Sequence, residues 1–427
     1  KKQVGKGVFF FFSNQAEYLT EKISVQYINN DEGVRQNFIV HAPLSKTDEL
    51  KINFSIKTKL KTYLQGNQLQ FFDKKTNVLN YEQLKVWDAN GKHLEASIKK
   101  NKKNKFYIHV DTKNAVYPIT VDPLSTTPNS TLDDANQAGA HFGYSVSSAG
   151  DVNGDGYSDV IVGAYSFTDG ANASEGRAFV YHGSATGLSA TPNSTPDDAN
   201  QALAQFGLSV GTAGDVNGDG YSDVIIGARD YDDAANSNEG RAYVYHGSAA
   251  GISAGPNSTL DDANLPGAGF GSSVASAGDV NGDGYSDVIV GAYRFSDGAN
   301  TAEGRAFVYH GSATGLSASP SSTPDDANQA NALFGISVAC AGDVNGDGFS
   351  DVVIGASQYD DGANTNEGRA FVYHGSAAGL SASPNSTPND GNQASALFGC
   401  SVASAGDVNG DGYSDVIIGA SQFDLVS

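Results

Sequence analysis

A nine-residue acidic loop, DVNGDGYSD, begins at Asp151 and carries the residue types of a cation site. Side-chain oxygens stand at its positions 1, 3 and 5, on Asp151, Asn153 and Asp155. The backbone carbonyl of Tyr157 is available at position 7, and the carboxylate of Asp159 closes the loop at position 9. A hard cation such as Ca²⁺ takes six to eight oxygen ligands from a compact loop. The spacing therefore predicts calcium binding.

The same loop occurs in five complete copies. Position 12 of the first copy is Val162 instead of Glu, and the flanks have the pattern of strands, so an EF-hand is disfavoured. A polar turn without metal is the alternative for one copy, but five copies in an acidic region favour metal, and Mg²⁺ fits less well because it keeps more of its water. We therefore expect about one Ca²⁺ per repeat, five in all. The further predicted ligands are Asp215, Asn217, Asp219, Tyr221, Asp223, Asp279, Asn281, Asp283, Tyr285, Asp287, Asp343, Asn345, Asp347, Phe349, Asp351, Asp407, Asn409, Asp411, Tyr413 and Asp415.

The charge of the chain divides it into two parts. Residues 1–124 hold 20 Lys and Arg against 12 Asp and Glu, whereas the remainder holds 6 Arg against 36 Asp and Glu. Self-repulsion among so many carboxylates destabilises a compact state unless cations neutralise it. The net charge of −22 also excludes nucleic acid as a partner, because binding phosphates requires Lys and Arg.

The loops belong to a unit that recurs every 64 residues. In the first unit, Phe142–Gly150, Asp159–Ala164 and Arg177–His182 have the pattern of three antiparallel strands, and Thr191–Thr195 that of a weaker outer strand. No helical period is present. Three or four short strands per repeat are typical of a β-propeller blade. The units contain Phe-Gly pairs that begin at Phe142, Phe206, Phe270, Phe334 and Phe398.

These features predict an all-β protein with two parts. The predicted propeller occupies residues 125–427, in repeats 126–189, 190–253, 254–317, 318–381 and 382–427. The last repeat lacks the counterpart of residues 176–184, so we expect a longer protein in which further blades or a partner complete the ring. Residues 1–124 predict a small β-sandwich of about seven strands. The expected strands are Ile23–Tyr27, Phe38–Val40, Ile52–Ile56, Leu69–Phe72, Leu84–Trp87, Phe106–Val110 and Val116–Val121.

Cysteine content and hydropathy add little about the compartment. Cys340 and Cys400 stand at different positions of their repeats, so we expect buried free thiols and no disulfide framework. No apolar run approaches the ~18–20 residues of a membrane helix. The chain contains no Met, and we expect that a signal peptide has been removed.

The ordered motifs resemble a known repeat family. Phe-Gly, then D-x-N-x-D-G-x-x-D, then [IV]-[IV]-G-A resembles the FG-GAP repeat of integrin α-chain propellers and of secreted bacterial proteins. The resemblance implies a ring of blades, calcium between the first two strands of each blade, and adhesion or ligand binding on the opposite face. The run Ala115–Pro123 also resembles the segment before such repeats in surface proteins of Bacteroidetes-type bacteria.

The repeats differ from one another just after the second strand. Tyr165, Arg229, Tyr293 and Arg294 stand there, and these residue types are enriched at binding hot spots. We therefore predict that these four side chains bind a glycan or protein ligand on the face opposite the calcium loops. Packing between blades is the alternative for the aromatic residues placed regularly in this connection, namely Phe167, Tyr231 and Phe295.

Nothing in the sequence predicts an enzyme. A catalytic centre is usually a single asymmetric constellation, whereas one His and one Arg recur in each third strand and therefore indicate blade structure. No nucleophile elbow, P-loop or zinc-spaced His and Cys set occurs. We predict a non-enzymatic extracellular or cell-surface protein that acts in adhesion or ligand binding. The alternatives are a purely structural subunit of a surface stalk or fibre, and an accessory propeller of a secreted enzyme with a catalytic domain beyond residue 427.

Overall fold

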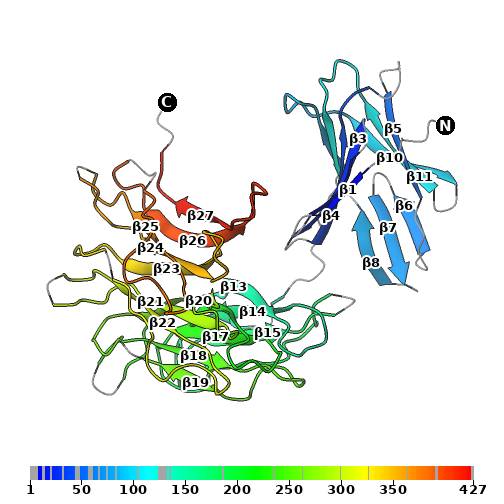
Figure 1. The fold of residues 1–427 in the computed structure, drawn as a ribbon. Helices are drawn as coiled ribbons and strands as arrows, with labels where there is room; N and C mark the ends of the chain where they lie inside the picture. Colours follow the sequence, from blue (N-terminus) through cyan, green and yellow to red (C-terminus); the bar gives the residue numbers. More distant parts are fainter. Residues whose placement is uncertain are drawn as a thin grey trace. The chain divides into compact units, whose positions relative to one another are not determined.

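The computed structural model is built of β-strands, and the described residues contain no helix. It separates into two compact units, Lys1–Thr131 and Leu132–Ser427, which are described one at a time (Figure 1). The boundary predicted after residue 124 falls among residues outside the described part. The structure describes residues 8–11, 15–19, 22–30, 33–43, 49–55, 61–65, 68–73, 76–81, 84–102, 105–123, 132–133, 136–184, 187–233, 236–261, 263–298, 300–325, 327–362, 364–389 and 393–424.

The first unit contains three sheets around one core. Their strand orders are β1-β2-β3-β4-β12-β9, β10-β11-β5 and β6-β7-β8. Val121, Ile108 and Leu69, one from each sheet, are fully buried in the same cluster, which agrees with a sandwich-like domain. The strands are β1 Val8–Phe11, β2 Gln15–Leu19, β3 Ile23–Asn30, β4 Gly33–Val40, β5 Glu49–Ser55, β6 Lys61–Gln65, β7 Gln68–Asp73, β8 Thr76–Tyr81, β9 Leu84–Trp87, β10 Ala96–Lys102, β11 Lys105–Asp111 and β12 Ile119–Pro123.

The expectation of about seven strands in this unit was too low. Polar strands such as Thr76–Tyr81 and Ala96–Lys102 lack the alternation that marks a half-buried strand, so the sequence did not reveal them. The last predicted strand also begins later than expected, at Ile119. Ile56, the predicted end of another strand, lies outside the described residues.

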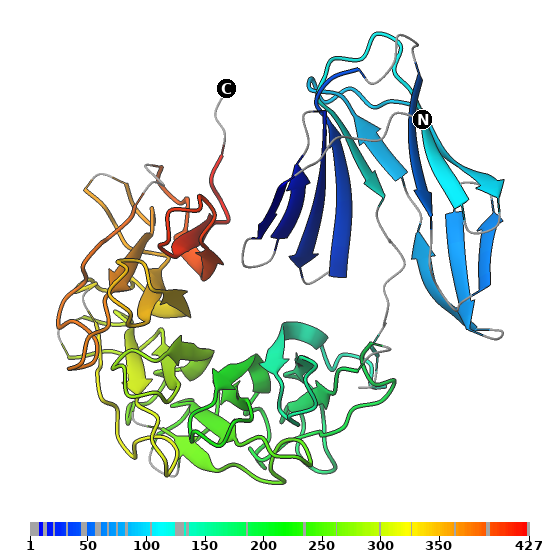
Figure 2. The ribbon, with the colours of Figure 1, turned by 45° about the vertical axis from the view of Figure 1, so that its right-hand side comes forward.

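The second unit is a row of small antiparallel sheets, one per repeat, and confirms the propeller-like arrangement. We number these sheets as blades 1 to 5 in chain order, and Figure 2 shows them following one another along an arc. The strands of blade 1 are β13 Phe142–Gly150, β14 Asp159–Ala164 and β15 Arg177–Tyr181. Those of blade 2 are β16 Phe206–Gly214, β17 Asp223–Ala228, β18 Arg241–Tyr245 and β19 Ser258–Leu260. Those of blades 3 to 5 are β20 Phe270–Gly278, β21 Asp287–Ala292, β22 Arg305–Tyr309, β23 Phe334–Gly342, β24 Asp351–Ala356, β25 Arg369–Tyr373, β26 Phe398–Gly406 and β27 Asp415–Ala420.

The outer strand of blades 1 to 4 is weak, as its polar sequence predicts. Among the described residues it forms a three-residue strand in blade 2 alone, as β19. In blade 1 the corresponding contact is an isolated bridge between Val180 and Ser194. A polar segment gains little by burial, so its pairing depends on a few backbone hydrogen bonds.

Adjacent blades approach so closely that the second strand requires glycine where it faces the next blade. A Cβ at Gly163 would lie 1.9 Å from the carbonyl oxygen of Gly207, and one at Gly227 would lie 1.9 Å from that of Gly271. The glycine of the Gly-Ala pair is therefore what allows backbone-to-backbone contact between blades. Buried aromatic residues fill the remaining space, including Tyr245 and Phe270, neither of which is exposed.

Candidate calcium loops and the opposite ends of the blades

The first predicted ligand of each loop lies at the loop's centre. In blade 2 one carboxylate oxygen of Asp215 accepts hydrogen bonds from the amides of Gly218 and Asp219, at 2.7 and 3.1 Å. Its other oxygen accepts from the amide of Gly220 at 2.8 Å. Three backbone amides therefore donate to one carboxylate, and these hydrogen bonds set the conformation of the loop.

The second and third predicted ligands are tied to each other. The Asn217 side-chain oxygen accepts from the Asp219 amide at 3.0 Å, while its NH₂ group donates to an Asp219 carboxylate oxygen at 2.9 Å. The other Asp219 oxygen accepts from the Tyr221 amide at 3.0 Å. The same bonds recur in the loops that begin at Asp279, Asp343 and Asp407.

The ninth residue of the loop is the buried one. Asp223 is fully buried, and its two oxygens accept from the amides of Val216 and Gly247 at 2.9 and 2.8 Å. It therefore ties the loop to the end of the third strand. Burial, with smaller contributions from Asp219 and Asp215, raises the pKa of Asp223 to about 7.

Blades 1, 3 and 4 repeat this environment. Burial raises the pKa of Asp287 to about 6, and it also raises the pKa of Asp159 and of Asp351. Among the described residues, no Lys or Arg forms an ion pair with a loop carboxylate. A buried carboxylate beside other carboxylates, with no Lys or Arg partner in the described residues, is an environment that a cation would stabilise.

The donor set fits Ca²⁺. Each loop offers three carboxylates, one amide oxygen and one carbonyl, all of them hard oxygen ligands. In the described part of the chain, no three His, Cys, Asp or Glu side chains converge closely enough to hold an ion by themselves. Metal binding would therefore also depend on the Asn217 oxygen and the Tyr221 carbonyl, and on their equivalents. The predicted ligand set remains a prediction.

The end of each blade opposite its loop carries the predicted ligand-binding residues. β13 runs toward the loop and β14 away from it, so residues just before β13 and just after β14 lie together at the other end. Tyr165 stacks on His141 with ring centroids 4.7 Å apart, and it meets Tyr144 edge-on at the same distance. Tyr144 is 64 % exposed. His141 and Tyr144 were not among the predicted ligand-binding residues, although both positions vary from repeat to repeat.

Arg229 is held in place by its neighbours. It donates to both oxygens of Asp230, each at 3.0 Å, and to the side-chain oxygen of Gln205 at 2.8 Å. Hydrogen bonding to Asp230 raises the pKa of Arg229, and Tyr293 and Tyr144 are among the groups that interact with its charge. The side chain is 28 % exposed, so part of the guanidinium remains open to solvent.

Tyr293 and Arg294 of blade 3 continue this surface. The Arg294 guanidinium lies over the Tyr293 ring, 4.9 Å from its centroid. A Cβ at Gly269 would meet both the Tyr293 ring and the Arg229 stem, at 3.0 and 3.5 Å, so these two side chains flank one point. Tyr293 is only 7 % exposed, so its ring supports Arg294 from below and offers little surface to a ligand. We call His141, Tyr144, Tyr165, Arg229, Tyr293 and Arg294 the aromatic–arginine surface.

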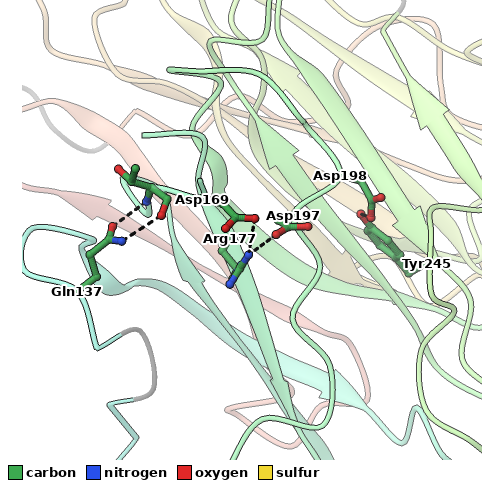
Figure 3. Close-up of polar contacts among 7 residues, drawn as sticks. Gln137, Asp169, Arg177, Asp197, Asp198 and Tyr245 are labelled. Atoms are coloured by element: carbon green, nitrogen blue, oxygen red, sulfur yellow. Dashed lines mark hydrogen bonds and ion pairs between the residues drawn. The ribbon is translucent and has the colours of Figure 1, made fainter. Parts of the chain in front are cut away.

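The regularly placed aromatics pack within blades. Phe167 lies under the Arg177 guanidinium, which is 4.4 Å from its centroid, and it contacts Phe179 edge-on. Arg177 also pairs with Asp169, at 3.0 Å, and with Asp197 (Figure 3). Tyr231, Phe295 and Tyr359 lie under Arg241, Arg305 and Arg369 in the same way. These repeated arginines therefore stabilise the packing inside the blades, as their recurrence predicts.

A buried glutamate in each of blades 1 to 4 was missed by the sequence analysis. Glu239 is 1 % exposed, accepts from the Asn264 amide at 2.8 Å and from the Asn236 side chain at 3.1 Å. Burial raises its pKa. The sequence signal for this residue was its recurrence directly before the Gly-Arg pair of each of these repeats. The equivalents are Glu175, Glu303 and Glu367.

The two cysteines are free, as predicted, but both are only half-buried. Burial raises the pKa of the Cys340 thiol. The described residues include no helix with the length and hydrophobicity of a membrane span.

Comparison with known proteins identifies the repeats. The FG-GAP repeat model matches residues 142–181, 206–245, 270–309, 334–373 and 398–427. Integrin alpha-V of Gallus gallus is 33% identical over 246 residues, which are 55% of this chain and 21% of the relative. Integrin alpha-5 of Xenopus laevis is 31% identical over 253 residues, covering 58% and 22%, and integrin alpha-IIb of Mus musculus is 37% identical over 164 residues, covering 37% and 15%.

The matched region is only about a fifth of these integrin chains or less. The likeness of residues 115–123 to bacterial surface proteins stays a prediction. The five matches coincide with the five blades and contain the five predicted calcium loops. The chain therefore carries five FG-GAP repeats and is similar in these repeats to integrin α chains.

Proposed function

We propose that this chain is an extracellular, non-enzymatic propeller that binds Ca²⁺ in its acidic loops and a glycan or protein ligand on the aromatic–arginine surface. The observation that carries the ligand proposal is the convergence of side chains from three blades at the ends opposite the loops. Only these repeats carry His, Tyr or Arg at the converging positions, so the surface is a single feature built on a repeated frame.

The aromatic–arginine surface has the chemistry of a recognition site. Tyr144 exposes a flat ring, and Tyr165 is held between it and His141, so little side-chain entropy is lost when a ligand packs there. Arg229 adds a charged donor whose position is already set by Asp230. Rigid aromatic groups and Arg dominate the binding energy of many interfaces.

Calcium would support this surface from the other end of the blades. Each loop connects the first two strands of its blade, and in blades 1 to 4 the buried ninth residue binds the loop to the end of the third strand. A cation that binds the folded loops alone stabilises the fold by mass action. Weak sites of about 10⁻⁴–10⁻³ M are typical of extracellular calcium modules. The resemblance to integrin α-chain repeats also supports a ligand-binding role.

The test is binding to glycan arrays and to a panel of surface proteins in the presence of calcium. We expect Tyr144→Ala combined with Arg294→Ala to lower affinity at least tenfold, because both side chains are exposed parts of the proposed site. Tyr63→Ala is the matched control, since this tyrosine is 52 % exposed and also makes one edge contact, but belongs to the first unit. Equal binding by the double variant and the parent would refute the ligand site and favour a purely structural subunit.

A further inference from the structure

Each of the first four loops is hydrogen-bonded to the loop of the next blade. The Ser222 amide donates to the Asp151 carbonyl at 3.0 Å, and the Asp151 amide donates to the Ser222 hydroxyl at 3.2 Å. The first of these bonds recurs at every junction between blades. Ser286, Ser350 and Ser414 donate to the carbonyls of Asp215, Asp279 and Asp343, at 2.9, 2.9 and 2.8 Å.

The donor at each junction belongs to the same peptide group as a predicted calcium ligand. The Tyr221 carbonyl, at position 7 of its loop, and the Ser222 N–H are the two polar ends of one planar unit. A cation that orients this carbonyl therefore also orients the N–H that bonds to Asp151. On the far side, the Val152 amide donates to the Asp159 carboxylate at 2.9 Å. Two peptide groups thus connect position 7 of one loop to position 9 of the preceding loop.

The side chain at position 7 makes a second contact across the junction. A Cβ at Gly154 would lie 2.6 Å from Cε1 of the Tyr221 ring, so the ring lies directly on the backbone of the preceding loop. Gly218, Gly282 and Gly346 are covered in the same way by Tyr285, Phe349 and Tyr413, each with a distance of 2.5 Å. The neighbouring loops therefore share both a hydrogen bond and a packed contact.

We propose that neighbouring loops bind cations cooperatively, with the peptide and ring of position 7 as the coupling elements. The inference rests on the proposed calcium binding. The first cation must order its own loop and, through the shared peptide, part of the preceding one. The next cation meets a loop that is already partly ordered and loses less conformational entropy.

Electrostatics opposes this coupling. A loop with three carboxylates keeps a negative charge after binding Ca²⁺, but it attracts a neighbouring cation less than an empty loop does. Salt screens this term, with a Debye length of about 8 Å at ~0.15 M ionic strength. Coupling through peptide orientation and packing does not depend on salt in this way. Cooperativity should therefore increase with salt concentration, whereas affinity should fall.

Calcium titration of the full chain, against a chromophoric chelator, tests the coupling. We expect a Hill slope above about one at ~0.15 M KCl and a steeper slope at ~0.5 M KCl. A slope of about one or below at both concentrations would overturn the coupling while leaving calcium binding intact. If no calcium binds, the calcium assignment in the proposed function is itself wrong.

Ring deletions test whether position 7 is the coupling element. Tyr221→Ala combined with Tyr285→Ala removes two junction rings but keeps both backbone carbonyls. We expect the Hill slope to fall toward one. Tyr157→Ala is the matched control: this residue has the same loop position and is 43 % exposed, but within the described part of the chain no loop glycine lies under its ring. A parental slope in the double variant, or an equal loss of slope in the control, would contradict the proposal.

A milder pair of substitutions covers the case in which the ring variant does not fold. Ser222→Ala with Ser286→Ala removes only the hydroxyls that accept from the Asp151 and Asp215 amides, each at 3.2 Å. We expect a smaller drop in the Hill slope than with the ring deletions, and none for Ser158→Ala, the same position in blade 1. An unchanged slope in this variant, at parental calcium stoichiometry, would count against the junction.

Discussion

Replacing Gly227 by Ala tests how the blades are joined. The new Cβ would lie 1.9 Å from the Gly271 carbonyl oxygen and 2.9 Å from its carbon. Real Cβ atoms do not approach other heavy atoms within 3.0 Å, so the backbones of blades 2 and 3 must separate by more than 1 Å. No flexible side chain is available to absorb this movement.

The expected cost follows from overpacking. Extra methyl groups in a tight core typically cost about 1–3 kcal/mol, and backbone-against-backbone contact places this site at the upper end. A loss of about 3 kcal/mol corresponds to a Tm lower by about 5–10 °C for a unit of this size. Arg229 and Tyr293 flank the same junction, so the variant should also weaken ligand binding.

Gly419→Ala is the matched control for this prediction. Gly419 holds the same place in β27, but its new Cβ would have ordinary contacts, the nearest at 3.6 Å from Ser401. We expect its stability to change by less than about 0.5 kcal/mol or to rise slightly, because Ala suits a strand better than Gly. Calorimetric melting of both variants decides the matter. Equal Tm values would refute the close approach of blades as an explanation for the Gly-Ala motif.

Three further predictions concern calcium, charge and buried hydroxyls. Removal of calcium with EGTA should lower the Tm by several degrees, because a ligand at ~100 times its Kd stabilises by about 2.7 kcal/mol per site; an unchanged melting curve would count against calcium binding. The raised pKa of Glu239 means that its contribution to stability is present at pH values below its unfolded pKa and is lost as the pH rises through the folded value. In EGTA, Glu239→Gln should therefore reduce the decline in Tm that follows as the pH rises above about 4.5. An equal decline in the variant and the parent would contradict this. Tyr245→Phe should cost about 1–2 kcal/mol in chemical denaturation, because its hydroxyl donates to Asp198 at 2.7 Å, whereas Tyr243→Phe should cost less, since the geometry of the described residues gives that buried hydroxyl no hydrogen bond of ordinary length and angle.

The blades could be predicted because their information is local and repeated. Asp159–Ala164 is a continuous apolar run with a carboxylate at its start, and it forms a buried strand that begins at the loop. The polar outer segment was correctly expected to pair weakly. In the first unit, by contrast, Ile119–Pro123 lies between Gly33–Val40 and Leu84–Trp87. Such pairing joins distant segments, and no short-range pattern encodes it.

The sequence by itself determined the blade, the number of its copies in this chain and the position of the acidic loops, because these features lie within short, repeated stretches of the chain. The calcium ligands of these loops remain a prediction. Only the tertiary structure decided which side chains are shared between blades. The meeting of Arg229 and Tyr293 at Gly269 and the covering of Gly154 by Tyr221 join residues 64 and 67 positions apart. These contacts depend on how closely and at what angle successive sheets pack, and that geometry arises from the whole stack of blades. The acidic loops are thus a local property of the chain, whereas the aromatic–arginine surface and the junctions between loops are properties of the assembled fold.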